Sequence, residues 1–120
     1  MAKLLGPDFL ALQVKNLASS AKFYEELLGL ERAPKSPPDA IVYQTSPIPF
    51  AIRKPLVDLS ASTRLGWGVA LWFQVDDADA LYRHLSDNGI RIPMPIQDGA
   101  FGRQFAFIDP DGYTITVHGG

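Results

Sequence analysis

The feature that most constrains the fold of this chain is an internal repeat of about half its length. Gln13-Val14 ends an alternating apolar segment, and Gln74-Val75 ends a similar segment 61 residues later. Each copy is followed by a helical pattern that closes at a glycine, Gly29 in the first half and Gly89 in the second. Two copies of a strand–helix–strands pattern indicate a duplicated module rather than a solenoid, because solenoids need about three or more units.

The first half predicts strands on either side of one helix. Residues 9–14 form an expected strand with two largely apolar faces, which suits a strand that faces a cavity or a second sheet. Asn16 is expected to cap the following helix, and Gly29 is expected to end it. Two more strands are predicted, at residues 40–45 and 50–54, where prolines separate them.

The second half predicts the same order. A strand over residues 69–75 precedes a helix capped by Asp76 or Asp77. The last two strands are expected at residues 105–108 and 113–118, joined by the tight turn Asp109-Pro110-Asp111-Gly112. Together the halves predict one domain over residues 1–120. It consists of a first module at about 8–55, a linker at 56–66 and a second module at about 67–119.

Composition excludes several classes of function. The chain has 120 residues and no cysteine, so it has neither a disulfide framework nor a thiolate metal site. Its net charge is −2 with scattered basic residues, which argues against a nucleic-acid partner. No apolar run approaches the ~20 residues of a membrane span, and the N-terminus lacks the pattern of a signal peptide. We therefore expect a cytoplasmic protein that contacts neither nucleic acid nor membrane.

Three segments, in the right order, carry a resemblance to a known family. Val14-Lys15-Asn16-Leu17 with the following segment 23–30 resembles the opening of a vicinal oxygen chelate module. Phe73-Gln74-Val75-Asp76-Asp77 resembles the opening of the second module, and residues 107–113 resemble its closing hairpin. That superfamily includes glyoxalase I, extradiol dioxygenases and bleomycin resistance proteins. The resemblance implies an α+β fold of two tandem βαβββ modules, whose curved mixed sheets surround a ligand cavity.

The same resemblance implies where a metal would bind. Metal-dependent members hold their ion with four inward side chains, typically histidine and glutamate, on the opening and closing strands. Carried onto this chain, those positions are Phe9, Ala51, Ala70 and Thr116, none of which is an ordinary metal ligand. The chain has two histidines, His84 and His118, whereas a catalytic zinc or iron site needs about three protein ligands. We therefore expect no metal and no cofactor.

The inward positions of the predicted strands combine small, aromatic and polar side chains, which suits a largely apolar organic ligand with a few polar groups. They include Phe9, Ala11, Gln13, Arg53, Trp72, Gln74, Thr116 and His118. The alternative is that these side chains only pack between the sheets. For Trp72 we favour a ligand contact, because a buried indole N–H needs a partner.

Three residues outside those strands complete the predicted site. Trp67 lies between two glycines, where it is suited to stack on a ligand or a partner subunit, or to anchor a hinge. Phe101 and Arg103 follow Asp98-Gly99, an expected loop at the cavity mouth. Arg103 is suited to pair either with an anionic ligand group or with a nearby carboxylate, and the second is commoner for an isolated arginine.

These observations lead to one main functional hypothesis. It is a metal-free binding protein of the bleomycin-resistance type, a homodimer by family analogy, which sequesters an aromatic or glycopeptide-type antibiotic or toxin. The first alternative is a lyase or dioxygenase of the same superfamily, which predicts bound metal. The second is an interaction domain whose cavity is filled by its own side chains.

Overall fold

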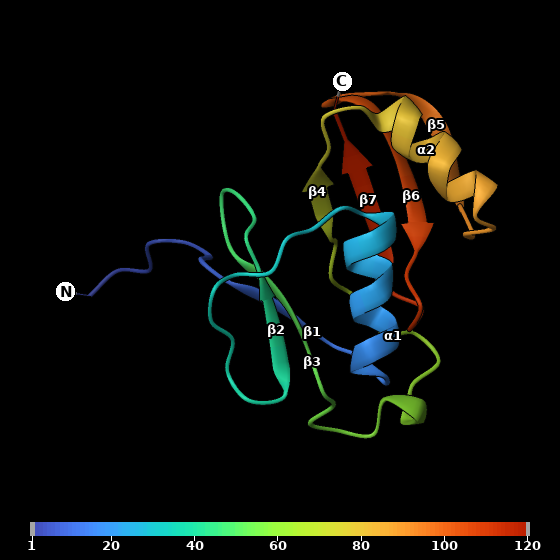
Figure 1. Cartoon of the computed structure of the whole chain (residues 1–120). Coiled ribbons are helices and arrows are strands. Elements are labelled where there is room, and N and C mark those ends of the chain that lie inside the picture. The colour runs from blue at the N-terminus through green and yellow to red at the C-terminus, as the bar shows by residue number, and fades with distance from the viewer. Residues whose placement is uncertain (1, 120) are drawn as a thin grey trace. The chain divides into compact units, whose positions relative to one another are not determined.

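The structure is a computed structural model that describes residues 2–119 (Figure 1). The chain forms two compact units, Met1–Leu59 and Ser60–Gly120. Within residues 2–119, no helix is long and apolar enough to cross a membrane. Each unit consists of one mixed sheet with a helix packed against one of its faces.

The first unit contains the α-helix α1 (Leu17–Lys22), which continues into the π-helix η1 (Phe23–Leu27). Its three strands, in the sheet order β1-β3-β2, are β1 (Leu10–Gln13), β2 (Ala40–Tyr43) and β3 (Phe50–Arg53). β1 runs parallel to β3, and β2 runs antiparallel to it. The predicted cap is confirmed, because Asn16 Oδ1 accepts a hydrogen bond of 2.9 Å from the Ser19 backbone N–H. Gly29 follows the helix with φ of +74°, as expected of a C-terminal glycine.

The second unit contains one helix, α2 (Ala78–Asp87), and a sheet with the order β4-β7-β6-β5. Its strands are β4 (Trp72–Gln74), β5 (Met94–Gly99), β6 (Gly102–Ile108) and β7 (Thr114–His118). β4 is parallel to β7, and the other pairs are antiparallel. Asp77 caps α2 by accepting a hydrogen bond from the Ala80 backbone N–H at 3.0 Å. Figure 1 shows α2 lying alongside β5 and β6.

The internal repeat is visible in the hydrogen bonds of the two sheets. Val14 N–H donates to Arg53 O at 2.9 Å, and Val75 N–H donates to His118 O at the same distance. In both units the opening strand therefore pairs in parallel with the closing strand. The predicted α+β class, with two curved mixed sheets, is confirmed. In the second unit, β5 is an additional strand. Its counterpart in the first unit is an isolated bridge between Arg32 and Tyr43.

Three local features differ from the sequence expectations. β5 was not predicted, because Pro95 lies within it and breaks the strand pattern. Proline is tolerated there because β5 is an edge strand, and the pairing with β6 shifts register between Met94 and Gln97. The expected linker contains a 3-10 helix, η2 (Leu59–Ala61), anchored by the buried Leu59 side chain. β4 is shorter than the strand predicted over residues 69–75.

Aromatic contacts identify the sheet face that packs on each helix. In the first unit, the rings of Tyr24 in η1 and Phe50 in β3 have centroids 5.3 Å apart. In the second unit, the rings of Tyr82 in α2 and Phe105 in β6 are also 5.3 Å apart. Since neighbouring residues along a strand point to opposite faces, each sheet has a second face without helix cover. We call these the open face of the first unit and of the second unit.

Candidate ligand-binding site

Strand register defines the open face of the second unit. Residues paired directly across a sheet project to the same side. Trp72 pairs with Thr116, and His118 pairs with both Gln74 and Gln104. Along the strands, these residues alternate with Phe105 and with the residues paired with it across the sheet. Phe105 and its paired residues face α2. The open face therefore carries Trp72, Gln74, Gln104, Thr114, Thr116 and His118.

Three predicted ligand residues come together on this face. The ring centroids of Trp72 and Phe101 are 5.9 Å apart, those of Trp72 and His118 are 6.0 Å apart, and those of Phe101 and His118 are 6.1 Å apart. Trp72 remains 47% exposed and Phe101 67% exposed. We call Trp72, Phe101 and His118 the aromatic trio. Such a cluster offers flat apolar surface that the unit itself leaves partly uncovered.

A tight hairpin brings Phe101 to the trio. Gly99 at the end of β5 pairs with Gly102 at the start of β6, so Phe101 lies in the turn between them. His118 Nδ1 lies 3.2 Å from the Phe101 carbonyl oxygen, which ties the turn to β7. The expected loop is therefore a short, hydrogen-bonded turn.

Trp67 lies in a different part of the second unit. It is 80% exposed and borders a hollow of about 300 Å³, together with Arg64, Tyr113 and Thr114. A side chain at Gly66 would meet the Tyr113 ring at 3.1 Å, so the turn that carries Trp67 packs closely against that ring. The structure does not bring Trp67 into the aromatic trio.

Arg103 lies on the opposite side of the sheet from the trio. Its Nε donates to Asp79 of α2 at 3.2 Å, and its guanidinium also reaches Asp98 at 3.3 Å. The hydrogen bond to Asp79 raises the pKa of Arg103. Of the two roles that the sequence left open, pairing with a carboxylate is the one present in the structure. Strand alternation explains this, because Arg103 shares its face with Phe105.

The open face of the first unit carries the remaining predicted residues. Ala11 pairs with Ala51, and Gln13 pairs with Arg53, on the side opposite Phe50. Gln13 Oε1 accepts a hydrogen bond of 2.7 Å from Leu56 N–H, and Arg53 Nε donates to its neighbour's carbonyl at 3.1 Å. This face is polar and lined by small side chains.

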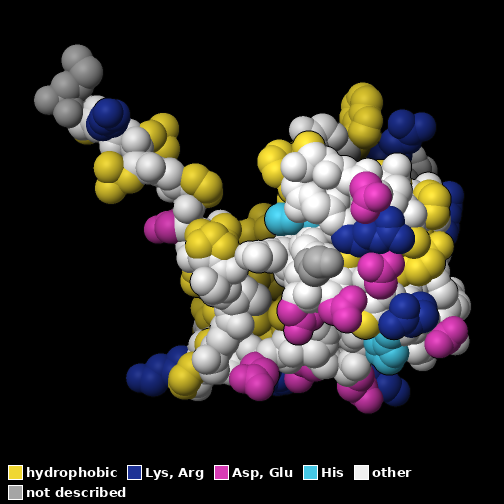
Figure 2. Space-filling view, turned by 90° about the horizontal axis from the view of Figure 1, so that it is seen from above, with side chains coloured by type: hydrophobic (Ala, Val, Ile, Leu, Met, Phe, Trp, Pro, Cys, Tyr) yellow, Lys and Arg dark blue, Asp and Glu magenta, His cyan; other side chains and the backbone are white. Residues whose placement is uncertain are grey.

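Phe9 precedes β1, two residues before Ala11, and is 50% exposed. The segment before β1 also exposes Leu4 and Leu5, and Figure 2 shows hydrophobic side chains along this segment. Phe9 therefore adds one aromatic ring at the margin of the first unit's open face.

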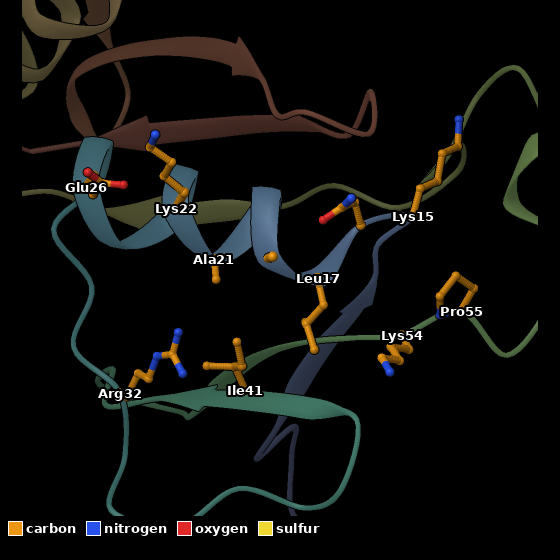
Figure 3. A pocket seen from close by; sticks show the side chains of 11 residues that line it. Lys15, Leu17, Ala21, Lys22, Glu26, Arg32, Ile41, Lys54 and Pro55 are labelled. Atoms are coloured by element: carbon orange, nitrogen blue, oxygen red, sulfur yellow. The ribbon is translucent and has the colours of Figure 1, made fainter.

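Sequence reasoning missed a hollow of about 840 Å³ on the helix side of the first unit (Figure 3). Leu17 and Ala21 of α1 face Ile41 of β2 across it. Lys15 and Lys22 lie on its rim but point away from Ile41 in Figure 3. The cationic groups therefore do not converge on one point.

Arg32, at one end of this hollow, belongs to a hydrogen-bonded cluster. Its Nε lies 3.1 Å from both carboxylate oxygens of Glu25, and the buried Tyr43 hydroxyl donates to the same carboxylate at 3.0 Å. The bond from Arg32 lowers the pKa of Glu25, and burial raises the pKa of Tyr43. The cluster ties the π-helix to β2.

The residues at the family's metal positions do not fit a metal ion. Ala51 pairs with Ala11, and Thr116 pairs with Trp72, so apolar side chains surround both closing-strand positions. Among residues 2–119, no three His, Asp or Glu side chains are grouped where they could hold a metal. Phe9 and Ala70 likewise offer no donor atom in their side chains.

Comparisons with known proteins agree with this fold. The model of the Glyoxalase/Bleomycin resistance protein/Dioxygenase superfamily matches residues 6–117. No curated protein gives a significant match. Among solved structures, the chain is similar to the bleomycin-binding protein of Streptomyces verticillus, with 22% identity, a TM-score of 0.65, and coverage of 100% of this chain and 99% of that one.

Two further solved structures resemble the chain over nearly its full length. A fosfomycin resistance protein from Listeria monocytogenes gives 19% identity and a TM-score of 0.74, covering 98% of this chain and 95% of that one. A lactoylglutathione lyase from Agrobacterium tumefaciens gives 18% identity and a TM-score of 0.69, covering 96% and 93% respectively. The family match spans most of the sequence and agrees with the duplicated sheets. The chain therefore belongs to the glyoxalase/bleomycin resistance protein/dioxygenase superfamily.

Proposed function

We propose that this protein captures a flat aromatic small molecule against the open face of the second unit, and that it acts by sequestration without a bound metal. The observation that carries the proposal is the aromatic trio, whose rings lie about 6 Å apart while Trp72 and Phe101 remain about half or more exposed. Exposed aromatic clusters of this kind commonly mark sites of binding.

Physical chemistry favours an aromatic ligand here. Trp72 and Phe101 meet edge to face at 82°, so they present ring surface in two directions. A ligand ring that covers them removes apolar surface from water, at about 25 cal/mol for each Å². Offset or edge-to-face ring contacts add about 0.5–1.5 kcal/mol. Nearby Thr116 and Gln74 provide polar groups that orient a bound molecule.

The open face of the first unit is a second, separate candidate surface for ligand contact. It carries the small side chains of Ala11 and Ala51, and there Gln13 and Arg53 supply polar groups for a ligand. A homodimer is part of this proposal, because the exposed Leu4, Leu5 and Phe9 side chains are apolar surface that a second copy would cover. Sedimentation of the purified chain tests this part, and a monomer at all concentrations would contradict it.

Isothermal titration calorimetry tests the capture hypothesis. The purified chain is titrated with polycyclic aromatic and glycopeptide antibiotics, alongside Trp72→Ala and the control Val57→Ala. Val57 is also an exposed apolar residue but lies outside the open faces. We expect saturable binding of at least one compound, weakened about tenfold in Trp72→Ala and unchanged in Val57→Ala.

Absence of binding across the panel would contradict the capture hypothesis. Tightly bound metal by elemental analysis, together with metal-stimulated turnover, would instead support the lyase or dioxygenase alternative. An equal loss of affinity in both variants would show that binding does not involve the aromatic trio.

A further inference from the structure

The His118 ring has a defined tautomer when it is neutral. Its Nδ1 lies 3.2 Å from the carbonyl oxygen of Phe101. A backbone carbonyl only accepts hydrogen bonds, so Nδ1 must carry the proton in this contact. In the neutral imidazole the other nitrogen, Nε2, then has a free lone pair and acts as an acceptor.

No residue of the described chain uses that acceptor. Within residues 2–119, the contact with Phe101 is the one hydrogen bond that the His118 ring makes. The side chain is partly exposed on the open face of the second unit. Among residues 2–119, no buried side-chain N or O atom lacks a hydrogen-bond partner, so the unpartnered Nε2 is not buried and is accessible to a donor from outside the chain.

The surroundings of His118 restrict the kind of donor that fits. Trp72 and Phe101 flank the ring at centroid distances of 6.0 and 6.1 Å, with interplanar angles of 59° and 56°. The residues paired with His118 in the sheet are Gln74 and Gln104, which are uncharged. The nearest charged pair along β6, Arg103 with Asp79, faces α2. A neutral hydrogen-bond donor on a flat ring fits this site, because the ring can contact Trp72 and Phe101 while the donor reaches His118 Nε2.

We infer that the ligand of this face carries an O–H or N–H group on the edge of an aromatic ring, as in a phenol or a heteroaromatic N–H, and donates it to His118 Nε2. This inference rests on the proposed capture of an aromatic molecule and specifies its chemical class. His118 acts as the specificity residue, while Trp72 and Phe101 contribute the apolar contact.

A matched pair of probes tests the inference. 2-Naphthol and 2-methoxynaphthalene have similar flat surfaces, but only the first has a donor. We expect the wild-type chain to bind 2-naphthol about five- to tenfold more tightly, which corresponds to one neutral hydrogen bond. The affinities are measured by calorimetry at neutral pH on the full chain.

Two variants assign the preference to His118. His118→Phe keeps a flat ring but removes the acceptor, so the preference for 2-naphthol should fall below about twofold. His118→Gln keeps an acceptor oxygen and should retain part of the preference. Circular dichroism and thermal midpoints confirm that both variants fold.

The outcomes separate this inference from the proposed function. Equal binding of both probes by the wild-type chain would overturn the role of His118 but leave aromatic capture intact. A preference that persists in His118→Phe would also overturn it. Failure of both probes to bind at millimolar concentration would overturn the inference together with the aromatic site.

Discussion

The two units share one framework but expose different chemistry on their open faces. The opening and closing strands pair identically in both, through Val14 with Arg53 and Val75 with His118. The first unit nevertheless presents small and polar side chains there, whereas the second presents the aromatic trio. The hydrogen-bonded framework and the helix-side core are thus shared by the two units, while the open-face positions differ, and under the proposed function those positions determine specificity.

The largest expected effect separates the two faces of the second unit. Phe105 is fully buried on the helix side, so Phe105→Ala should lower the free energy of unfolding by about 3–5 kcal/mol. Trp72 is half exposed on the open face, so Trp72→Ala should lower it by about 1–2 kcal/mol. Urea unfolding measures both. Similar losses in the two variants would show that the open face contributes to the core.

The next effect compares the two open faces directly. Phe101→Ala should weaken binding of a polycyclic aromatic ligand about tenfold, because it removes a large part of the aromatic surface. Arg53→Ala should weaken it about threefold at most, because it removes one partly exposed polar group. Calorimetry gives both affinities. The reverse ranking would move the main contact to the first unit.

A smaller effect concerns acid stability of the first unit. The hydrogen bond from Arg32 holds the pKa of Glu25 below its ordinary value of 4.5. Because the pKa of Glu25 is lower in the folded chain than in the unfolded chain, its carboxylate stabilises the fold at pH values above the unfolded-state pKa. That stability is lost as the pH falls through the folded-state pKa. Unfolding free energies at pH 6 and pH 3 should therefore differ more in the wild-type chain than in Glu25→Gln. An identical difference in both would remove this role of Glu25.

The smallest effect is expected at Arg103. Because this side chain pairs with Asp79 on the helix side, Arg103→Met should change ligand affinity by less than about twofold. Phe101→Ala, two residues away, is the matched comparison, because that variant should weaken ligand binding about tenfold. A tenfold loss in Arg103→Met would restore Arg103 as a ligand contact.

Local signals in the sequence predicted much of the framework. The caps at Asn16 and Asp77 were predictable because short polar side chains satisfy free N–H groups at helix starts. The turn at Asp109 was also predictable, since its carboxylate accepts hydrogen bonds from the N–H groups of Asp111 and Tyr113.

Other features depend on long-range pairing and were not predictable from local patterns. β5 contains Pro95, and only its pairing with β6 makes it a strand. The contact of Phe101 with His118 requires the hairpin register, which a sequence does not specify by itself. The position of Arg103 could have been found, because extending the alternation of Phe105 and Phe107 by two residues places it on the helix side.

The two tryptophans serve as separate fluorescence reporters of where a ligand binds. In Trp67→Phe the fluorescence comes from Trp72 alone, and in Trp72→Phe it comes from Trp67 alone. We predict that a bound polycyclic aromatic ligand quenches Trp72 saturably in Trp67→Phe and leaves the fluorescence of Trp72→Phe nearly unchanged at the same concentrations. Saturable quenching of Trp67 without quenching of Trp72 would contradict the assignment of the binding site to the aromatic trio.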